Sequence, residues 1–257
     1  MGLKNRIKGK IRRFILTSSV TTDSDASSFF ELEDDCQISN LAYLYELFFG
    51  TDVLGTYVEI GANDGLQVSN TFCLAKRGWR GELVEPISQI AKKASLNFKD
   101  YPSVSVHNLG IAAPGEKQIE LKVAGLLSTG RPELYEEYKT TDWALKSLTD
   151  HIVTAKVVTL DDFLSSRNLD PAFELLVVDV EGYEKQVFAG FDIDYWRPKM
   201  IIVELSDTHP DLRVLSVEHA NIYLKIIGSG YIVVYKDAIN SVFVSKPLFS
   251  EIFSARF

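Results

Sequence analysis

Short apolar segments alternate with amphipathic segments from residue 56 onward. The apolar segments predict strands near 56–60, 82–85, 103–107, 174–179, 199–205, 231–235 and 241–245. The amphipathic segments predict helices near 69–77, 87–98, 159–168, 183–190 and 216–227. The segments LLVVDV and MIIVEL have no polar alternation, which indicates parallel strands that are buried on both faces. This order of strands and helices predicts an α/β fold with a doubly wound, mostly parallel sheet.

The last two predicted strands, YIVVY and SVFVS, are separated only by the turn-like segment KDAIN. A crossover helix does not fit into five residues, so this pair is predicted to be an antiparallel hairpin. In the helix predicted near 216–227, one face is shared by Val217, Ala220, Leu224 and Ile227. Residues 109–157 interrupt the rhythm and contain a strand candidate at 117–123. We interpret 109–157 as an insertion beside the ligand crevice that forms the substrate region.

The first 28 residues differ from the rest of the chain. Residues 1–15 have apolar positions at helical spacing with lysines and arginines on both flanks. This pattern suits a helix in peripheral contact with an anionic membrane surface, and it also suits a solvated basic tail or a helix packed on a partner. Residues 17–28 are rich in Ser, Thr and Asp and are interpreted as a linker. Residues 29–257 then form the main domain, beginning with an apolar helix over 38–49.

Charge and cysteine content exclude several classes of function. The chain has 27 basic and 35 acidic residues, and six basic residues lie within 1–13, so the remainder carries 21 against 35, a net charge of −14. Such an acidic body would repel a nucleic-acid backbone. Cys36 and Cys73 have no C-x-x-C spacing, which argues against a zinc ribbon or a disulfide scaffold. With no apolar run of about 18 residues and no secretory signal, a cytoplasmic location is expected.

The segment VEIGANDG at 58–65 is the most informative motif. A strand that contains Glu59 leads into a turn of spacing G-x-N-x-G, formed by Gly61, Ala62, Asn63, Asp64 and Gly65. In open α/β sheets, ligands bind at such turns beyond the carboxyl ends of strands. The turn lacks the G-x-G-x-x-G pattern for a pyrophosphate, and Glu59 would repel a phosphate but attract an ammonium group. It therefore favours a cationic, phosphate-free nucleoside over NAD.

A second acid ends the next predicted strand. GELVEP at 81–86 places Glu85 twenty residues after Gly65, at the position where an acid commonly binds two ribose hydroxyls. Pro86 then ends the strand and begins the next helix. Either acid alone is more simply a solvated surface residue, whereas the two together, with a glycine turn between them, favour a nucleoside site.

Several blocks resemble the FkbM-type methyltransferases. They are VEIGANDG, SNT at 69–71, RGWRGELVEP at 77–86, KVVTLDDFL at 156–164, VVDVEGYE at 177–184 and RPKMIIVE at 197–204. The resemblance spans about residues 30–245 and implies a class I methyltransferase (Rossmann-like) sheet of seven strands, with S-adenosyl-L-methionine as cofactor. Characterised relatives mostly methylate hydroxyl oxygens of sugars or other natural products. Asn70 either caps a helix or contacts the methionine carboxylate. The implied cofactor-binding residues are Glu59, Gly61, Ala62, Asn63, Asp64, Gly65, Asn70, Glu85, Pro86, Asn108 and Asp179.

An alcohol needs a base or a metal to take its proton before methyl transfer. The candidate catalytic residues at the carboxyl edge of the sheet are Asp179, Glu181, Glu204 and His209. His209 is expected to be the general base, aided by Asp179 or Glu181. Alternatively, Asp179 and Glu204 hold a divalent cation that acidifies the hydroxyl.

For some neighbouring residues, a structural role is the alternative to a role in catalysis. Glu184 is expected to stabilise a helix N-terminus, and Glu204 could instead pair with Arg197. His219 is expected to be an ordinary packed or surface residue.

The leading hypothesis is an S-adenosylmethionine-dependent O-methyltransferase acting on a hydroxyl of a small molecule or glycan, most specifically a carbohydrate. The alternative is a non-catalytic module of the same fold that docks to membrane or glycan through its basic N-terminal helix. An NAD-dependent sugar enzyme is disfavoured because the glycine fingerprint is missing.

Overall fold

The computed structural model describes residues 36–206, 209 and 211–254. The basic helix predicted for residues 1–15 and the linker predicted for 17–28 lie outside the described residues. The membrane contact expected of that helix therefore stays a prediction.

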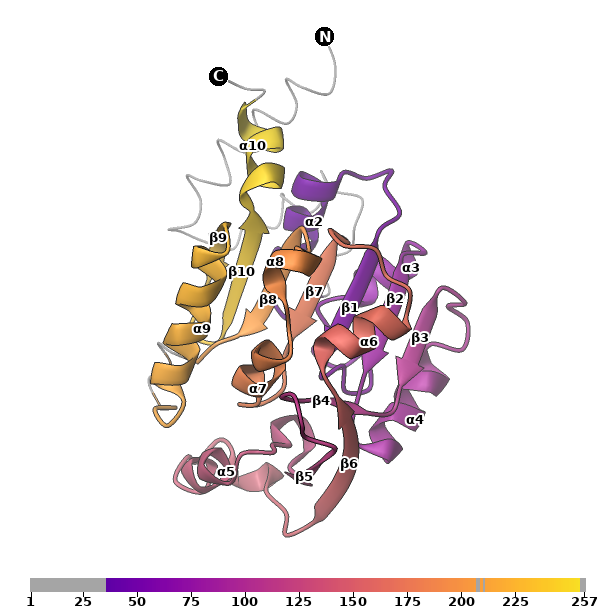
Figure 1. The fold of residues 1–257 in the computed structure, drawn as a ribbon. Coiled ribbons are helices and arrows are strands. Elements are labelled where there is room, and N and C mark those ends of the chain that lie inside the picture. The colour runs from indigo at the N-terminus through magenta and orange to yellow at the C-terminus, as the bar shows by residue number, and fades with distance from the viewer. Residues whose placement is uncertain (1–35, 207–208, 210, 255–257) are drawn as a thin grey trace.

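A seven-stranded sheet forms the centre of the molecule (Figure 1). Its order is β3-β2-β1-β7-β8-β10-β9, and the first five strands of this order are mutually parallel. β10 runs antiparallel to both β8 and β9, which confirms the predicted hairpin. The strands are β1 (Thr56–Ile60), β2 (Arg80–Val84), β3 (Val104–His107), β7 (Leu175–Val178), β8 (Met200–Glu204), β9 (Tyr231–Lys236) and β10 (Asn240–Ser245).

Helices cover both faces of this sheet, as a doubly wound fold requires. One core cluster packs α2, α3 and α10 against residues such as Val177, and the other packs α6, α7 and α9 against residues such as Leu176. Because neighbouring residues of β7 enter opposite cores, the strand is buried on both faces, and its lack of polar alternation is explained. The helices are α2 (Leu41–Phe49), α3 (Phe72–Lys76), α4 (Ser88–Asn97), α6 (Leu160–Ser166), α7 (Glu184–Ala189), α8 (Ile193–Trp196), α9 (Ser216–Gly228) and α10 (Lys246–Ser254).

The predicted insertion lies beyond the carboxyl ends of the parallel strands (Figure 1). It contains α5 (Pro132–Tyr138) and a second sheet of order β4-β6-β5. The strands of this sheet are β4 (Gly110–Ile111), β5 (Gln118–Lys122) and β6 (Ile152–Val158). β5 matches the strand predicted for 117–123. β6 was not predicted, although exposed and buried residues alternate along its second half.

Two further features differ from the sequence prediction. Val217 and Leu224 of α9 are 72% and 63% exposed, whereas His219, Ile222 and Ile226 are buried. The apolar face identified in the sequence is therefore not the one that packs on the sheet. The Sγ atoms of Cys36 and Cys73 lie 3.5 Å apart without a disulfide bond, a contact that their sequence separation did not suggest.

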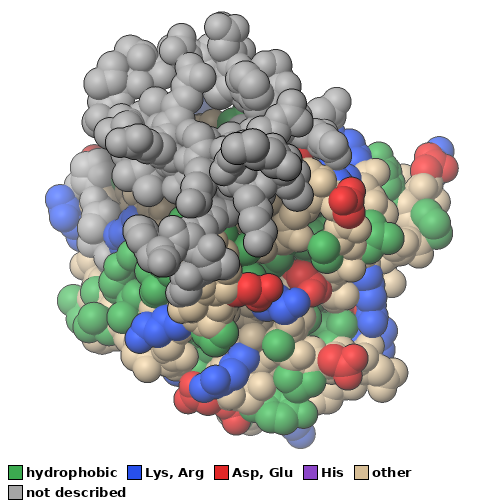
Figure 2. All heavy atoms as spheres, turned by 90° about the horizontal axis from the view of Figure 1, so that it is seen from above, with side chains coloured by type: hydrophobic (Ala, Val, Ile, Leu, Met, Phe, Trp, Pro, Cys, Tyr) green, Lys and Arg blue, Asp and Glu red, His purple; other side chains and the backbone are tan. Residues whose placement is uncertain are grey.

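Two features of the described residues concern contact with membranes or other molecules. Among the helices of the described ranges, none has the length and apolar character to cross a bilayer. At the end opposite the insertion, acidic, basic and apolar side chains are interspersed over the described surface (Figure 2). The described part of that face therefore does not show a continuous patch of one charge.

Candidate active site

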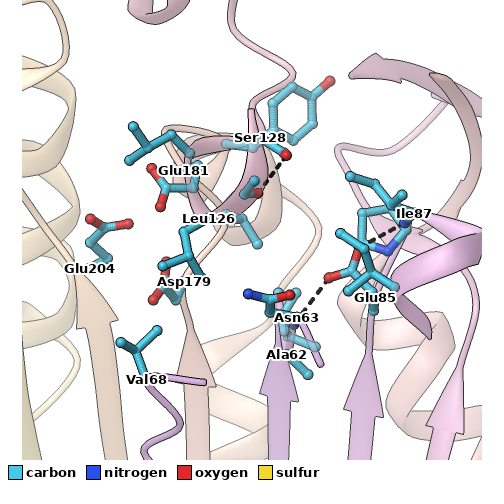
Figure 3. Close-up of a pocket in the computed structure, with 18 of the residues that line it drawn as sticks. Ala62, Asn63, Val68, Glu85, Ile87, Leu126, Ser128, Asp179, Glu181 and Glu204 are labelled. Carbon is cyan, nitrogen blue, oxygen red and sulfur yellow. Dashed lines mark hydrogen bonds between the residues drawn. The ribbon is translucent and has the colours of Figure 1, made fainter. Parts of the chain in front are cut away.

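A cavity of about 250 Å³ lies where the carboxyl ends of β1, β2, β7 and β8 meet the insertion (Figure 3). Its described lining includes no lysine or arginine. Five carboxyl groups line it, from Glu59, Glu85, Asp179, Glu181 and Glu204. The cavity is therefore strongly acidic and suits a neutral or cationic ligand.

The turn after β1 is held in the gap between β2 and β7. The backbone N–H groups of Gly61 and Ala62 both donate to the carbonyl of Val84, at 2.9 and 3.0 Å. Gly61 has φ +85°, and a Cβ there would lie 1.7 Å from the carbonyl oxygen of Asp179. Only glycine fits such a conformation and such an approach. The glycine thus allows the end of β7 to lie directly against the turn.

Glu85 is fixed at the entrance of the next loop. Its Oε2 accepts the N–H of Asn63 at 3.1 Å, and its Oε1 accepts the N–H of Ile87 at 2.7 Å. Burial raises the pKa of Glu85 to about 7. Each carboxylate oxygen accepts more than one hydrogen bond, so both can still receive hydroxyl donors from a ligand. Pro86 also lines the cavity.

Glu59, near the end of β1, is buried and also lines the cavity. Its Oε2 accepts the hydroxyl of Thr71 at 2.6 Å. Burial raises its pKa to about 7, and the charge of Asp179 contributes to that rise. A cationic ligand group beside Glu59 would favour the ionised carboxylate.

Asn70 lines the cavity but does not cap α3. Its Oδ1 accepts the N–H of Ile38 at 3.1 Å, and its Nδ2 donates to Gln37 at 2.9 Å. Ser69 satisfies the helix start instead, because its hydroxyl oxygen accepts the N–H groups of Thr71 and Phe72. The capping alternative for Asn70 is therefore wrong, and its side chain instead ties the 37–38 segment to the cavity wall.

Three residues of the predicted cofactor set do not line the cavity. Asp64 accepts the N–H groups of Leu66 and Gln67 and pairs with Lys93. Gly65 has φ +74° and lies against the ring of Phe98. Asn108 donates to the carbonyls of Glu85 and Pro86, both at 3.0 Å. These residues shape the loops around the cavity rather than its lining.

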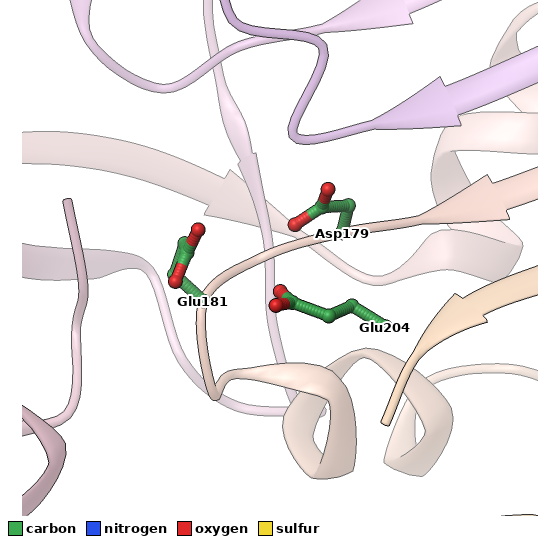
Figure 4. Close-up of side chains that lie close together, drawn as sticks. All are labelled: Asp179, Glu181 and Glu204. Atoms are coloured by element: carbon green, nitrogen blue, oxygen red, sulfur yellow. The ribbon is translucent and has the colours of Figure 1, made fainter. Parts of the chain in front are cut away.

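Asp179, Glu181 and Glu204 form a cluster of carboxyl groups (Figure 4). One oxygen from each lies within 4.8 Å of the others. Burial raises the pKa of all three, and mutual repulsion adds to the rise for Glu181 and Glu204. The hydroxyl of Tyr138 donates to Glu181 at 2.7 Å. Such a cluster can retain a proton, accept one from a ligand or hold a cation.

One of these structural alternatives requires correction. Glu204 does not pair with Arg197, which instead lies 3.9 Å from Asp194. Glu184 begins α7, as expected of a helix-terminal acid, but it is 0% exposed and contacts His219 at 3.0 Å. His219 is packed, as predicted, yet it adjoins the acids. No spacing rule predicts this contact, because the two residues are separated by 35 positions.

His209 lines the cavity beside the aromatic residues of the insertion. Its ring lies 6.2 Å from that of Trp143, which lies 6.1 Å from that of Tyr138. The Nδ1 atom of His209 accepts the N–H groups of Asp211 and Leu212, both at 3.1 Å. A backbone N–H can only donate, so the neutral ring carries its proton on Nε2. In this geometry His209 offers a donor rather than the free lone pair of a base, and the carboxyl groups are the better proton acceptors.

The methyltransferase FkbM domain profile matches residues 59–233. A search of curated protein sequences finds no significant match. The structure is similar to a methyltransferase FkbM from Methylobacillus flagellatus KT (16% identity, TM-score 0.45), covering 77% of this chain and 47% of that one. This chain thus spans about half the length of that protein.

Two further solved structures are similar. One is a putative O-methyltransferase from Klebsiella pneumoniae, with 13% identity, TM-score 0.43 and coverage of 92% of this chain and 96% of that one. The other is a precorrin-6y C5,15-methyltransferase from Geobacter metallireducens GS-15, with 11% identity, TM-score 0.42 and coverage of 88% and 97%. The matched domain profile covers more than half of the chain and includes all five acids of the cavity. The protein therefore belongs to the FkbM methyltransferase family.

Proposed function

We propose that this protein is an S-adenosylmethionine-dependent O-methyltransferase that acts on a hydroxyl group of a carbohydrate, either a glycan or a glycosylated metabolite. The family membership supports methyl transfer. The observation that carries the rest is one cavity with five carboxyl groups and, among its described lining residues, no lysine or arginine.

The residues present fit the cofactor. Glu85, with both oxygens oriented by backbone N–H groups, would hold the ribose hydroxyls. Glu59 would attract the amino group of the methionine end, and the acidic lining suits a cationic nucleoside without phosphates. When bound, the cofactor supplies a methyl group activated by its positive sulfur.

The carboxyl cluster would remove the acceptor proton. The acceptor oxygen must lie about 3–3.5 Å from the methyl carbon and in line with the leaving sulfur. As the new oxygen–carbon bond formed and the carbon–sulfur bond broke, the hydroxyl proton would pass to a carboxylate of Asp179, Glu181 or Glu204. A raised pKa suits this role, since the carboxylate is then a stronger base near neutral pH. Tyr138 orients Glu181 by donating to it.

The same cluster also fits a divalent cation. Hard cations such as Mg²⁺ prefer carboxylate oxygens, and Asp179 and Glu204 are the ligands that the sequence suggested. Glu181 is a third candidate because its oxygen lies within the same 4.8 Å limit. A cation there would acidify the hydroxyl, so either arrangement serves the same proton removal.

The walls of the cavity favour a neutral polyhydroxylated acceptor. Trp143, Tyr138 and His209 present aromatic groups next to the carboxyl cluster. An aromatic face packs against the apolar side of a sugar ring, while carboxylates accept its hydroxyls. A phosphorylated acceptor would meet five acids without a basic partner from the described lining.

Calorimetric titration with S-adenosylhomocysteine tests the cofactor assignment. A dissociation constant below about 1 mM is expected. The acceptor is then sought by incubating the protein with trideuteromethyl-labelled cofactor and a sugar-containing cell extract. Mass spectrometry should find the label on a carbohydrate oxygen. Failure to bind S-adenosylhomocysteine would overturn the proposal. Label on nitrogen or on a non-carbohydrate oxygen would overturn the acceptor class.

A further inference from the structure

A buried chain of hydrogen bonds joins the ends of β7 and β8. His219, near the start of α9, is 3% exposed. Its Nδ1 accepts the backbone N–H of Ser206 at 2.8 Å and lies 3.1 Å from the Ser206 hydroxyl. Its Nε2 lies 3.0 Å from Oε2 of Glu184. The imidazole therefore bridges the segment after β8 and the first residue of α7.

The partners of the ring fix its tautomer. The backbone N–H of Ser206 can only donate, so Nδ1 must be unprotonated. The ring proton then lies on Nε2 and is donated to Glu184. Both nitrogens of His219 are thus used, and neither faces the cavity as a base.

Glu184 carries the bridge on to the turn that holds Glu181. Its Oε1 accepts the N–H groups of Val180 and Gly182, at 3.2 and 3.3 Å. Between them the backbone is unusual, since Glu181 and Gly182 have φ of +50° and +93°. A non-glycine residue in the left-handed region is unfavourable by about 1–2 kcal/mol and needs support from its surroundings. Glu184 supplies part of that support.

The other end of the bridge adjoins Glu204. Ser206 follows Glu204 by two residues on the same chain segment. We propose that His219 is a positioning residue, which ties this segment to the 180–182 turn so that Glu204 and Glu181 stay within reach of one acceptor hydroxyl. This inference rests on the proposed function, and it assigns a role to a side chain that contacts neither cofactor nor acceptor.

Apolar packing alone does not require a histidine here. Ile222 and Ile226 fill the same side of α9 with aliphatic groups. His219 instead accepts the N–H of Ser206, which follows β8, and donates to the carboxylate of Glu184 at the start of α7. Leaving each unpaired in the interior costs roughly 1–3 kcal/mol, so a variant will lose stability whether or not the positioning role is real. The test must therefore separate positioning from stability.

The test compares His219→Phe with Lys225→Met. Lys225 donates to the carbonyl of Phe188 at 2.8 Å and so links the same two helices six residues further along α9. In His219→Phe, deuterium exchange at the amides of Val180 and Gly182 should be at least about tenfold faster, because their acceptor is released. Lys225→Met should leave those amides unchanged.

Cofactor binding and methyl transfer complete the comparison. His219→Phe should bind S-adenosylhomocysteine within about twofold of wild type, since Glu59 and Glu85 are untouched. Its rate of trideuteromethyl incorporation at saturating cofactor should fall at least about tenfold. His219→Gln, which retains one donor and one acceptor, should restore part of both the exchange protection and the rate.

Ring nitrogen NMR of the wild-type protein keeps the proposal testable if the variant does not fold. The expected spectrum has His219 protonated on Nε2 and unprotonated on Nδ1. A proton on Nδ1, unchanged amide exchange in His219→Phe, or an unchanged transfer rate despite a lower melting temperature would each overturn the positioning role. A wild-type protein that binds no S-adenosylhomocysteine would instead overturn the proposed function itself.

Discussion

At the residue scale, Glu85 should contribute more to ligand affinity than any other single carboxyl group. A charge-assisted hydrogen bond is worth about 1.5–3 kcal/mol, and in the proposed complex Glu85 would accept two from a ribose. Glu85→Gln keeps the size of the side chain but loses the charge. We expect S-adenosylhomocysteine to bind the variant roughly tenfold to a hundredfold more weakly, measured by calorimetry.

Glu82→Gln is the matched control for this prediction. Glu82 lies on β2, which ends just before Glu85, and it is as buried as Glu85, but it pairs with Arg80 and His107 and does not line the cavity. Its substitution should change stability and leave the affinity within about twofold. Equal effects of the two substitutions on affinity would contradict the ribose assignment of Glu85.

Glu204→Gln should separate chemistry from cofactor binding. Glu204 lies in the carboxyl cluster, away from Glu85, and serves either as proton acceptor or as cation ligand. Removing its charge should lower the rate of methyl transfer by about 100-fold or more, with the affinity for S-adenosylhomocysteine nearly unchanged. Both are measured on the same preparation. A variant that transfers methyl groups at the wild-type rate would exclude Glu204 from the chemistry.

The sequence locates the acids of the cavity well and its other side chains poorly. Glu59, Glu85 and Asp179 end or follow parallel strands, and parallel strands deliver such residues to one edge of a sheet. Tyr138 contacts Glu181 from the inserted helix α5, and His219 contacts Glu184 from α9, and no spacing rule predicts either contact. The tautomer of His209 depends on two local N–H donors, which only coordinates reveal.

At the element scale, the contact of the β1 turn with the end of β7 should depend on Gly61. In Gly61→Ala, the added methyl would lie 1.7 Å from the carbonyl oxygen of Asp179. Backbone must move to relieve this, at a cost we expect to exceed about 3 kcal/mol of unfolding free energy. Urea denaturation of the purified variant measures the loss.

Gly50→Ala isolates the steric part of that loss. Gly50 has φ +84°, close to the +85° of Gly61, but a Cβ there meets nothing within 4 Å. Its ψ is 175°, so Gly50→Ala should show only the cost of a side chain in this glycine-specific backbone region, about 1–3 kcal/mol, without a steric clash. Similar losses in the two variants would mean that the turn and the end of β7 are not in close contact.

Helices and strands could be predicted where burial requires a recognisable pattern of apolar residues along the sequence. Strands β7 and β8 are apolar on both faces, so their type followed from composition alone. β6 was missed because its first residues are exposed or half-buried and its sheet has only three strands. α9 has two apolar stripes, and periodicity cannot say which of them contacts Phe243 and Val203. Packing against the sheet determines which stripe is buried.

At the scale of the whole molecule, the acidic cavity should make the ligand-free protein less stable as pH rises. The pKa values of Glu59 and Glu85 are raised from 4.5 to about 7, so the folded state binds more protons than the unfolded state between these values. Their stabilising contribution is complete below pH 4.5 and is lost as pH rises to about 7. Between about pH 5 and pH 8, wild type should lose roughly 2 kcal/mol more unfolding free energy than Glu85→Gln, by urea denaturation. Glu136→Gln, which changes an exposed carboxyl group, should keep the wild-type dependence, and the same dependence in Glu85→Gln would show that Glu85 is not held in a proton-retaining site.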